Sequence, residues 1–316
     1  MAASATWFPH RPWRWQEVDP AAVAAHRRLV GDRVAVVIPA VDEAGTVAGV
    51  VAATREVPGL VDEVVVVDGG STDGTQERAA AAGARVVDQR AVLPEAGPPG
   101  GKGDALWKGL AVTGGDIVVF LDADVHAPDV RYVAGLLAPV LADARIAVAK
   151  ACYDRPLHVG DVVEPTGGGR VTELVARPLL AAFWPHLSGL VQPLAGEYAG
   201  RRGVLEQVPF VAGYGIEFAL LIDVAARWGT DAIAQVDLGT RRHTHQSLAA
   251  LSAMAAEILQ VAATRLRAEG RLTGEVGTLL RRPQRDRSGN LQLGETQVTV
   301  AERPPLAAFR AGWHPV

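Results

Sequence analysis

Residues 34–46 read VAVVIPAVDEAGT, and residues 63–75 read EVVVVDGGSTDGT. Each segment is a run of mostly β-branched apolar residues that ends in a polar turn, which is typical of a buried strand followed by a loop. A helix-like segment at about 46–55 connects the two runs. The order strand, helix, strand predicts parallel strands whose carboxyl ends, with their acidic turns, meet at one edge of a sheet.

The same alternation continues along the chain. Helices are predicted at 75–83, 105–113, 213–229 and 246–268, and strands at 84–88, 116–122 and 232–240. Strands that are apolar on both faces and alternate with helices predict an α/β fold with helices on both faces of the sheet. By contrast, residues 281–290, RRPQRDRSGN, are charged and rich in turn formers, so we expect a mobile stretch there.

Composition excludes several classes of protein. The chain has 316 residues, 49% of them apolar and 21% charged, which indicates a folded domain rather than a disordered or fibrous chain. A net charge of −4 gives no general attraction for nucleic acid or an anionic membrane. Cys152 is the single cysteine, so a reducing cytoplasm fits best. We expect neither a signal peptide at the N-terminus nor a membrane-spanning helix.

Two sequence features point to a metal ion. Asp122-Ala123-Asp124 follows an apolar strand, and in an extended backbone both carboxylates face the same side. Such hard oxygen ligands suit Mg²⁺ or Mn²⁺, which would bridge a diphosphate, although the alternative is an ordinary surface loop. His243 and His245 are spaced in the same way and are either ligands or loop histidines. Arg241 and Arg242 beside them would instead suit a phosphate.

Two glycine-rich turns are candidate anion sites. Lys102 lies in the turn at 100–103, just before a predicted helix, and the segment lacks the P-loop pattern. The turn at 167–169 is followed by Arg170 and Thr172, which offer a cation and a hydroxyl. The second turn is equally consistent with a plain glycine turn and a solvent-facing arginine. Two anion sites at one edge suggest two phosphorylated substrates.

Other polar residues allow two interpretations. The turn after Asp68 carries hydroxyls and carboxylates that either contact a ligand or cap the next helix, and Glu43 has the same two readings. Tyr214 could stack on a sugar, and Glu217 could assist charge development. Glu217 is equally consistent with an ordinary first-turn glutamate on a helix.

Taken in order, the segments of this chain resemble the glucosyl-3-phosphoglycerate synthases, retaining glycosyltransferases with the GT-A nucleotide-sugar-binding fold. The resemblance runs from about residue 33 to 265, with a weaker match in AERPPL at 301–306. It is carried by IPAVDEAGTV, VVVVDGGSTDGT, GKGDALWKGL, GDIVVFLDAD, TGGGRVTELVARPLLA, GEYAGRR, GYGIEFALLID and AQVDLGTRRH. Each motif is weak alone, but the ordered set is specific.

The resemblance implies a GT-A fold with a mixed, mainly parallel sheet and an appended C-terminal helical part. It implies an N-terminal extension at 1–30, a nucleotide-sugar-binding half at 31–150, an acceptor-binding half of the same domain at 151–250, and a C-terminal helix and tail at 251–316. It also implies transfer of glucose from UDP-glucose to the 2-hydroxyl of 3-phosphoglycerate with retention. The product would lead to methylglucose lipopolysaccharide or glucosylglycerate, and the protein would be a cytoplasmic homodimer that requires Mg²⁺ or Mn²⁺.

The family's site residues are carried onto matching positions of this chain. The nucleotide-sugar contacts would be Pro39, Ala40, Val41, Glu43, Asp68, Gly70, Ser71, Lys102, Asp122, Ala123 and Tyr214. The acceptor contacts would be Gly169, Arg170, Thr172 and His245. The metal ligands would be Asp122, Asp124 and His243, with Glu217 and Asp124 as the catalytic residues.

The chain departs from the family pattern at two positions. Asp42 replaces the usual asparagine before Glu43, and His245 replaces the asparagine two residues beyond the metal histidine. A related family transfers mannose from GDP-mannose to the same acceptor, and the nucleotide loops do not exclude that donor.

Three further classes of protein compete with this interpretation. They are a transferase with a lipid-phosphate acceptor, a sugar-nucleotide pyrophosphorylase, and a nucleotide-sugar-binding protein without transfer activity. The lipid-phosphate transferase would need an apolar acceptor surface or a membrane helix, and the sequence indicates neither. The pyrophosphorylase would need a GxGTRxxP-like loop where this chain has PAVDEAGT. The binding protein is distinguished from an enzyme only by an assay of transfer.

Overall fold

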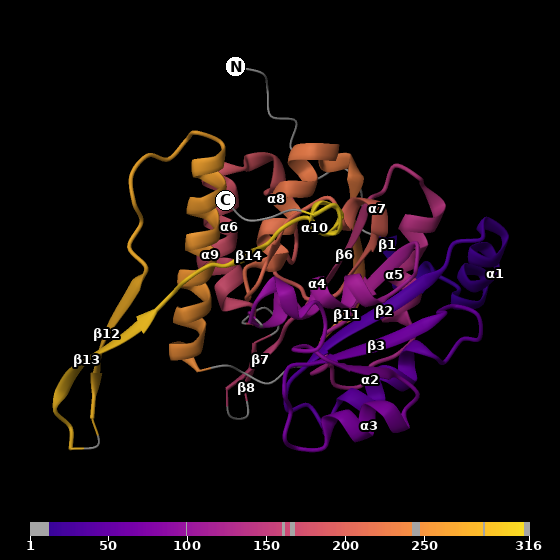
Figure 1. The fold of residues 1–316 in the computed structure, drawn as a ribbon, viewed down its shortest axis with the longest axis horizontal. Helices are drawn as coiled ribbons and strands as arrows, with labels where there is room; N and C mark the ends of the chain where they lie inside the picture. The colour runs from indigo at the N-terminus through magenta and orange to yellow at the C-terminus, as the bar shows by residue number, and fades with distance from the viewer. Residues whose placement is uncertain are drawn as a thin grey trace.

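A computed structural model describes residues 13–98, 100–159, 162–164, 168–241, 247–286 and 288–312. Its centre is an eight-stranded sheet in the order β1-β11-β6-β9-β5-β2-β3-β4 (Figure 1). The strands are β1 Trp13–Arg14, β2 Val34–Ala40, β3 Glu63–Asp68, β4 Arg85–Asp88, β5 Ile117–Phe120, β6 Val148–Asp154, β9 Tyr198–Arg201 and β11 Ile233–Thr240. All neighbours pair in parallel except β9, which is antiparallel to β5 and β6. The predicted mixed, mainly parallel sheet is confirmed.

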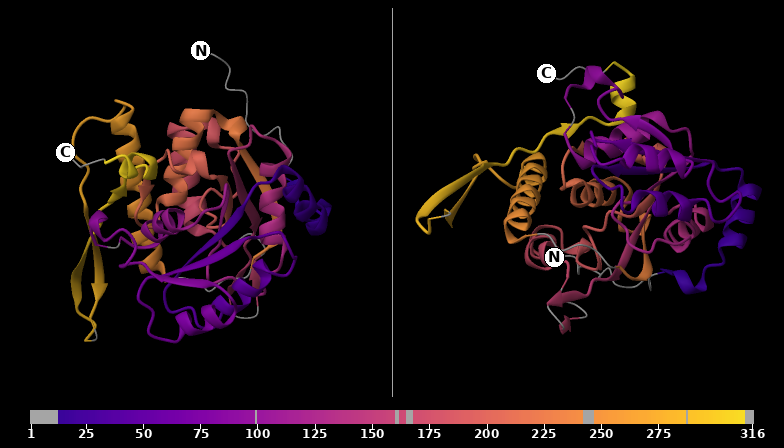
Figure 2. Two further views of the ribbon diagram at one scale, coloured as in Figure 1. Left: turned by 45° about the vertical axis from the view of Figure 1, so that its right-hand side comes forward. Right: turned by 90° about the horizontal axis from the view of Figure 1, so that it is seen from below.

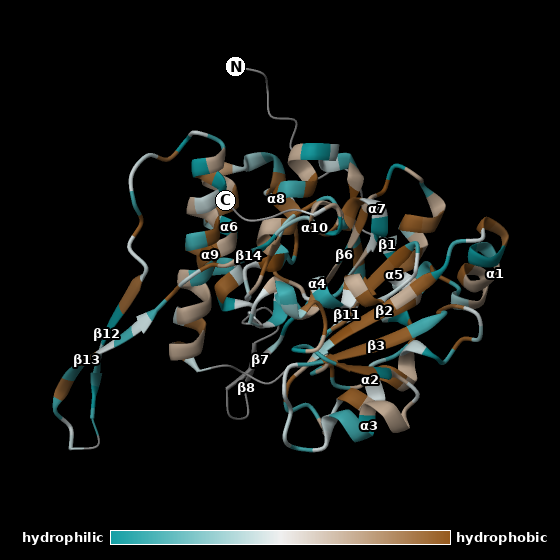
Figure 3. Ribbon diagram, viewed as in Figure 1, coloured by the Kyte–Doolittle hydropathy of each residue, from teal (hydrophilic) through white to brown (hydrophobic). Residues whose placement is uncertain are grey.

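Helices cover both faces of the sheet, because alternate residues of each strand point to opposite sides. On β2, Val37 joins one apolar cluster, while Val36 and Ile38 join the other. One face carries α1 Pro20–Val30, α2 Val47–Thr54, α3 Thr75–Ala81 and α5 Arg131–Ala142. The other face carries α4 Lys102–Val112, α6 Arg177–Phe183, α7 Arg202–Leu205, α8 Ile216–Trp228, α9 Leu248–Ala268 and α10 Leu306–Arg310. Figure 3 shows β2 and β3 as continuous apolar segments inside these layers.

The register of the central strands places three polar turns at one edge. Ala40 pairs with Asp68, and Val37 pairs with Phe120. The chain therefore leaves β2, β3 and β5 on the same side of the sheet, as the sequence predicts. The turns that follow are the segments at 41–46, 69–75 and 121–129.

Shorter elements complete the fold. Two strand pairs are β7 Leu157–Val159 with β8 Val162–Glu164 and β10 Phe210–Val211 with β14 Glu302–Arg303. The short helices are η1 Trp15–Glu17, η2 Pro94–Ala96, η3 Thr172–Ala176, η4 Pro185–Leu187 and η5 Thr230–Ala232, of which η3 is a π-helix.

Cys152 is buried in β6, and burial raises the pKa of its thiol to about 12.

The charged stretch at 281–290, expected to be rich in turns, contains most of a strand and the turn that follows it, and its mobility stays a prediction. Strands β12 Leu279–Arg285 and β13 Leu291–Gln297 form an antiparallel hairpin that projects from the body of the protein (Figures 1 and 2). Leu291 and Leu293 are exposed on it, and Arg281 pairs with Glu295 at 2.8 Å. With almost every side chain exposed, the strands lack the apolar alternation that identifies a half-buried strand.

Helix α9 lies between this hairpin and the body (Figure 2). By length and composition alone it could cross a membrane, and 33% of its most apolar stretch is buried in the protein. Ile258, Val261 and Leu266 on its inner side belong to the apolar core. Core helices often meet the same criterion, so the observation is weak evidence for a membrane span.

Candidate active site

A cavity of about 490 Å³ opens beyond the end of β5. Its walls come from the start of α4, the turn after β5, the segment before η3, the turn before α8, one side of α9 and the end of the hairpin. The predicted residues that line it are Lys102, Asp122, Asp124, Gly169, Arg170, Thr172, Tyr214 and Glu217. Residues far apart in the sequence, from both the expected donor half and the expected acceptor half, are thus brought together.

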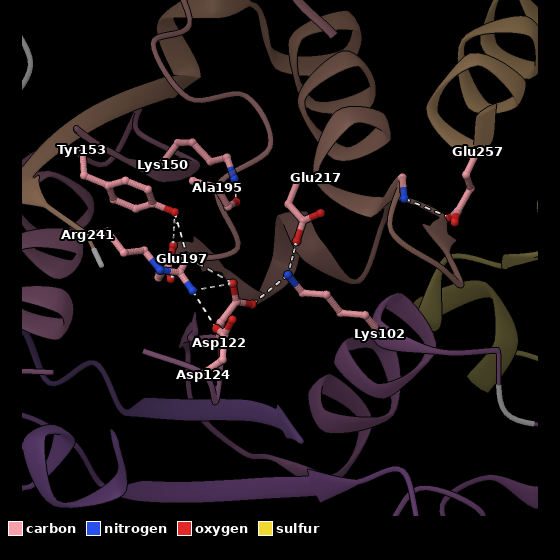
Figure 4. A network of polar contacts seen from close by, with 11 residues as sticks. Lys102, Asp122, Asp124, Lys150, Tyr153, Ala195, Glu197, Glu217, Arg241 and Glu257 are labelled. Carbon is pink, nitrogen blue, oxygen red and sulfur yellow. Dashed lines mark hydrogen bonds and ion pairs between the residues drawn. The ribbon is translucent and has the colours of Figure 1, made fainter. Parts of the chain in front are cut away.

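Lys102 joins two carboxylates across the cavity wall (Figure 4). Its Nζ lies 2.7 Å from Oδ1 of Asp122 and 2.8 Å from Oε1 of Glu217. Burial alone would lower the pKa of Lys102, but the two carboxylates outweigh that effect and raise it well above its ordinary value. Glu217 is 3% exposed and lies in the first turn of α8. The lysine is therefore a fixed cation that orients both acidic groups.

Arg241 is the second cation of the cluster and contacts three carboxylates. Its guanidinium lies 2.6 Å from Glu197, 2.7 Å from Asp124 and 3.3 Å from Asp122. It also donates a 2.9 Å hydrogen bond to the hydroxyl of Tyr153. Burial would raise the pKa of Asp122, but the cations on either side of it hold the pKa far below its ordinary value. Asp122 is therefore a carboxylate at neutral pH.

Two further ionisable groups lie buried behind this cluster. Glu197 has no exposed surface, and burial raises its pKa, while its Oε2 accepts a 2.8 Å hydrogen bond from Tyr153. Lys150 is also buried, and burial lowers its pKa to about 8. Its Nζ donates to the carbonyl of Ala195 and lies 5.1 Å from the ring centroid of Tyr198. Neither group was among the predicted site residues: Glu197 lies in the GEYAGRR segment, from which no site role was assigned, and Lys150 lies within β6 without a recognisable motif.

The cluster suits a divalent cation that shares its ligands with a substrate. Asp122 and Asp124 both reach the guanidinium of Arg241, so their carboxylates face the same space, as the Asp-x-Asp spacing predicts. Asp122, Asp124, Glu197 and Glu217 lie among three cations, Lys102, Arg241 and the buried Lys150. Carboxylate oxygens are the ligands that such a divalent cation prefers. Within the described part of the chain, no group of three or more His, Cys, Asp or Glu side chains could hold a metal ion by itself. The remaining ligands would have to come from the substrate or from residues outside that part.

Two of the predicted site residues fall outside the described residues. His243 and His245, with Arg242, belong to the segment 242–246, which directly follows Arg241. Their assignments to the metal and to the acceptor therefore remain predictions. The segment is attached at both ends to parts of the structure that lie at the cavity, since Arg241 and Ala250 both line it.

Two further arginines, Arg155 and Arg170, line the cavity. Arg155 lines it next to the predicted Gly169-Arg170 turn, and the backbone carbonyl of Arg155 accepts a 2.9 Å hydrogen bond from Gly168. Its guanidinium carbon lies 5.8 Å from the ring centroid of Tyr153, and no carboxylate of a described residue forms an ion pair with it. Arg155 was not among the predicted residues. The sequence gives no signal for it beyond its place just after an apolar strand.

The predicted contacts at the ends of β2 and β3 lie at the adjacent edge and do not line the cavity. Asp42 donates its backbone N–H to Ser71 at 2.9 Å, and its carboxylate accepts from the N–H of Thr72 at 2.8 Å. The N–H of Glu43 donates to the hydroxyl of Thr75 at 2.8 Å. Asp42 has a φ of 54°, a left-handed conformation that Asp and Asn tolerate better than most residues. Aspartate and the family's usual asparagine therefore both suit position 42.

Asp68 orders the second of these turns from within. One carboxylate oxygen accepts hydrogen bonds from the N–H groups of Gly70 and Ser71 and from the side chain of Gln76. The other oxygen is buried and has no hydrogen-bond partner among the described residues. Loop ordering is thus the role of Asp68 that its contacts show, and its assignment as a nucleotide contact stays a prediction. The remaining predicted contacts at this edge are Pro39, Ala40 and Val41, with Val41 exposed, and Ala123 is buried in the turn after β5.

Comparison with known proteins agrees with this arrangement. The sequence model of glycosyl transferase family 2 matches residues 35–162. Glucosyl-3-phosphoglycerate synthase from Mycolicibacterium paratuberculosis is 45% identical over 96% of this chain and 92% of its own length. The enzyme of that name from Petrotoga mobilis is also 45% identical, over 78% of this chain and 76% of its own.

Solved structures show the same fold. Mannosyl-3-phosphoglycerate synthase from Rubrobacter xylanophilus has a TM-score of 0.89 at 37% identity and covers 98% of both chains. Glucosyl-3-phosphoglycerate synthase from Mycobacterium tuberculosis, solved with Mn²⁺ and UDP-glucose, has a TM-score of 0.81 at 41% identity, covering 95% of this chain and 97% of its own. The GT-A fold expected from the sequence is confirmed. With this identity along nearly its whole length, the chain belongs to the glucosyl-3-phosphoglycerate synthase family and is a glycosyltransferase.

Proposed function

We propose that this protein transfers glucose from UDP-glucose to the 2-hydroxyl of 3-phosphoglycerate with retention of configuration. The observation that carries the proposal is one cavity lined both by an acidic cluster and by further arginines. The acidic cluster contains Lys102 and Arg241, and Arg155 and Arg170 line the same cavity. A diphosphate held through a metal suits the acidic cluster, and an acceptor with a phosphate and a carboxylate suits the two arginines. Relatives solved with UDP-glucose and with phosphoglyceric acid support both assignments.

Asp122 and Asp124 would hold the divalent cation together with the diphosphate oxygens. When bound, the cation neutralises the negative charge that develops on the departing diphosphate. Mn²⁺ is present in the relatives' structures, and Mg²⁺ has the same preference for oxygen ligands. The shared orientation of Asp122 and Asp124 around Arg241 supports this assignment from the chain's own residues.

In the transfer, the bond between the anomeric carbon and the β-phosphate oxygen breaks while the acceptor's 2-oxygen bonds to the same carbon from the same face. The proton of the 2-hydroxyl passes to the departing phosphate oxygen, so no protein nucleophile is required. Lys102 fixes Glu217 beside the cavity at 2.8 Å, and Glu217 orients the sugar or the acceptor hydroxyl. Arg155 and Arg170 hold the anionic groups of the acceptor.

The donor has a second candidate. The mannosyl-3-phosphoglycerate synthase structure has the higher TM-score, 0.89 against 0.81, although the curated relatives named above are glucosyl enzymes. GDP-mannose is therefore the alternative donor for the same acceptor chemistry.

We further propose that the protein is a cytoplasmic homodimer whose product leads to glucosylglycerate or methylglucose lipopolysaccharide. The projecting hairpin supports the dimer, because a two-stranded hairpin alone is marginally stable in water and this one exposes Leu291 and Leu293. The single buried Cys152 is compatible with a reducing compartment.

The test is a transfer assay with purified protein, 3-phosphoglycerate, Mn²⁺ or Mg²⁺, and either UDP-glucose or GDP-mannose. Mass spectrometry would detect the phosphorylated glycoside and the released nucleotide. We expect product only when the acceptor is present, with UDP-glucose the better donor. Nucleotide binding without product from either donor would contradict the transfer and leave a nucleotide-sugar-binding protein.

A further inference from the structure

The C-terminal segment 301–304 contacts two parts of the chain, one that leads to Glu217 and one that carries Lys102. At the first part, β14 pairs antiparallel with β10, with Arg303 opposite Phe210. The N–H of Ala212 continues the pairing with a 2.8 Å hydrogen bond to the carbonyl of Ala301. Because β10 leads directly into the turn that carries Tyr214 and Glu217, this pairing fixes the approach to α8.

At the second part, the Arg303 side chain holds the loop that leads to Lys102. Its Nε lies 2.5 Å from the Asp104 carboxylate, in the first turn of α4. Its terminal nitrogens donate to the carbonyls of Ala96 and Pro98, the latter at 2.8 Å. One side chain thus joins the helix start that carries Lys102 to the loop before it.

Trp107 packs against the side chain of Arg303. The guanidinium carbon of Arg303 lies 5.7 Å from the ring centroid of Trp107, which has no exposed surface. The indole N–H donates a 2.9 Å hydrogen bond to the carbonyl of Pro304. The arginine therefore has one well-defined place, between a buried ring and a buried carboxylate.

The start of α4 also packs tightly on the strand that precedes Glu217. The N–H of Asp104 donates to the carbonyl of Ala212 at 3.0 Å. A Cβ atom added at Gly103 would lie 1.8 Å from the carbonyl oxygen of Val211, so only glycine allows this approach. A shift of the loop by a fraction of an ångström would thus reach Lys102 directly.

We propose that Arg303 is a positioning residue for the nucleoside-diphosphate sugar, acting through Lys102. By holding α4 and the 210–217 segment together, it sets the place of the ammonium group between Asp122 and Glu217. The proposal rests on the proposed function, because it assumes that a nucleotide sugar binds at Lys102. Polar groups that orient a ligand-contacting residue typically contribute about 10–100-fold to affinity or activity.

The variant R303Q removes the charge and most of the carbonyl contacts. Asp104 would keep Gln89 at 2.7 Å and Lys108 at 3.5 Å, so its carboxylate stays partnered and the fold is expected to survive. The matched control is R310Q in the neighbouring helix α10, which breaks the contacts of Arg310 with Glu206 and the carbonyl of Ala111. The intermediate variant R303K restores the charge beside Asp104 but not the planar set of donors.

The experiment measures steady-state kinetics with both substrates varied, together with calorimetric titration of UDP in the presence of Mn²⁺ and thermal unfolding. For R303Q we expect the KM for the nucleotide sugar and the Kd for UDP to rise about tenfold, with the KM for the acceptor within about twofold of wild type. R303K should fall between R303Q and wild type. R310Q should lower Tm without changing either nucleotide constant.

Two failures are distinguishable. If wild-type protein binds UDP but forms no glycoside, the proposed transfer fails, and the UDP titration of the variants still tests Arg303. If R303Q lowers Tm to the same extent as R310Q while both nucleotide constants stay at wild-type values, Arg303 is merely structural and the inference is overturned. Equal increases in the KM values of donor and acceptor would overturn it as well, because a general disturbance of the cavity produces that pattern.

Discussion

The edge formed by the turns after β2 and β3 differs from the charged cluster beyond β5 in how its polar groups are satisfied. At the edge, Asp42, Ser71 and Thr75 bond to backbone N–H groups of the neighbouring turn. In the cluster, the carboxylates of Asp122, Asp124 and Glu217 are held by other charged side chains.

The edge therefore has a fixed backbone conformation, whereas the ion pairs of the cluster can be exchanged for other charged partners. Side-chain bonds to the backbone define one conformation of the two turns, and each contributes about 1 kcal/mol to stability. Ion pairs between side chains in a cavity can be exchanged for a metal ion or a phosphate without moving the backbone. We therefore expect substitutions at the edge to lower stability and substitutions in the cluster to lower activity.

Glu217→Gln should show the largest effect. The side chain keeps its size but loses the charge that faces Lys102 and the reacting groups, so we expect transfer to fall by about 10²–10³-fold with little change in Tm. The control is Glu173→Gln, an exposed helix glutamate outside the cavity lining. Turnover near the wild-type value in Glu217→Gln would remove Glu217 from the mechanism and weaken the contrast between the two regions.

Asp124→Asn should weaken metal binding by at least about tenfold, because a neutral amide replaces a carboxylate that faces the proposed cation. Calorimetric titration of Mn²⁺ into the protein measures this without turnover. The matched substitution Asp129→Asn changes an acidic residue of the same β5–α5 loop that pairs with Arg131 and does not line the cavity. Equal Mn²⁺ affinity in the two variants would exclude Asp124 as a ligand.

Lys150 gives the cluster a pH dependence of stability. Its pKa falls from about 10.5 in the unfolded chain to about 8 in the folded protein, so above pH 8 the unfolded state binds the additional proton. The free energy of unfolding of the metal-free wild type should therefore rise relative to Lys150→Met by about 2 kcal/mol between pH 7.5 and 9.5. Urea unfolding at several pH values measures the difference. A constant difference across that range would show that Lys150 titrates alike in both states.

Ser71→Ala should have the smallest effect on function. It removes the hydroxyl that accepts from the N–H of Asp42 at 2.9 Å, and we expect a loss of about 1 kcal/mol in stability. Transfer at saturating substrate should stay within about threefold of wild type. A loss of activity as large as that in Glu217→Gln would mean that the edge takes part in the chemistry, and the comparison between the two regions would fail.

Much of the fold follows from the sequence because its strands are buried on both faces. The runs at 34–39 and 64–67 are apolar throughout, and strands β2 and β3 match them closely. The hairpin at 279–297 could not be predicted in the same way, since its strands are exposed and charged. Charge and turn formers describe such strands and mobile loops equally well, and only the pairing of the two strands separates them.

Site residues that a short sequence pattern assigns a role were predictable, whereas residues that reach the site only through the packing of distant strands were not. Asp122 and Asp124 follow a recognisable strand, and their shared orientation around Arg241 agrees with their spacing. Lys150 lies in β6 and Glu197 directly precedes β9, and these two strands pair although they are distant in sequence, so only the folded structure brings both residues to the cluster. Arg155 is likewise brought to the site only by the folded structure.

The buried cysteine has a practical consequence for studies of assembly. Because Cys152 is 3% exposed and burial raises the pKa of its thiol to about 12, almost no reactive thiolate is present at neutral pH. A cysteine introduced at exposed Leu291 would then be the only position that a thiol-directed spin label or fluorophore modifies. Distances between labels on two copies would report the arrangement of the projecting hairpins in solution, with the native sequence otherwise intact.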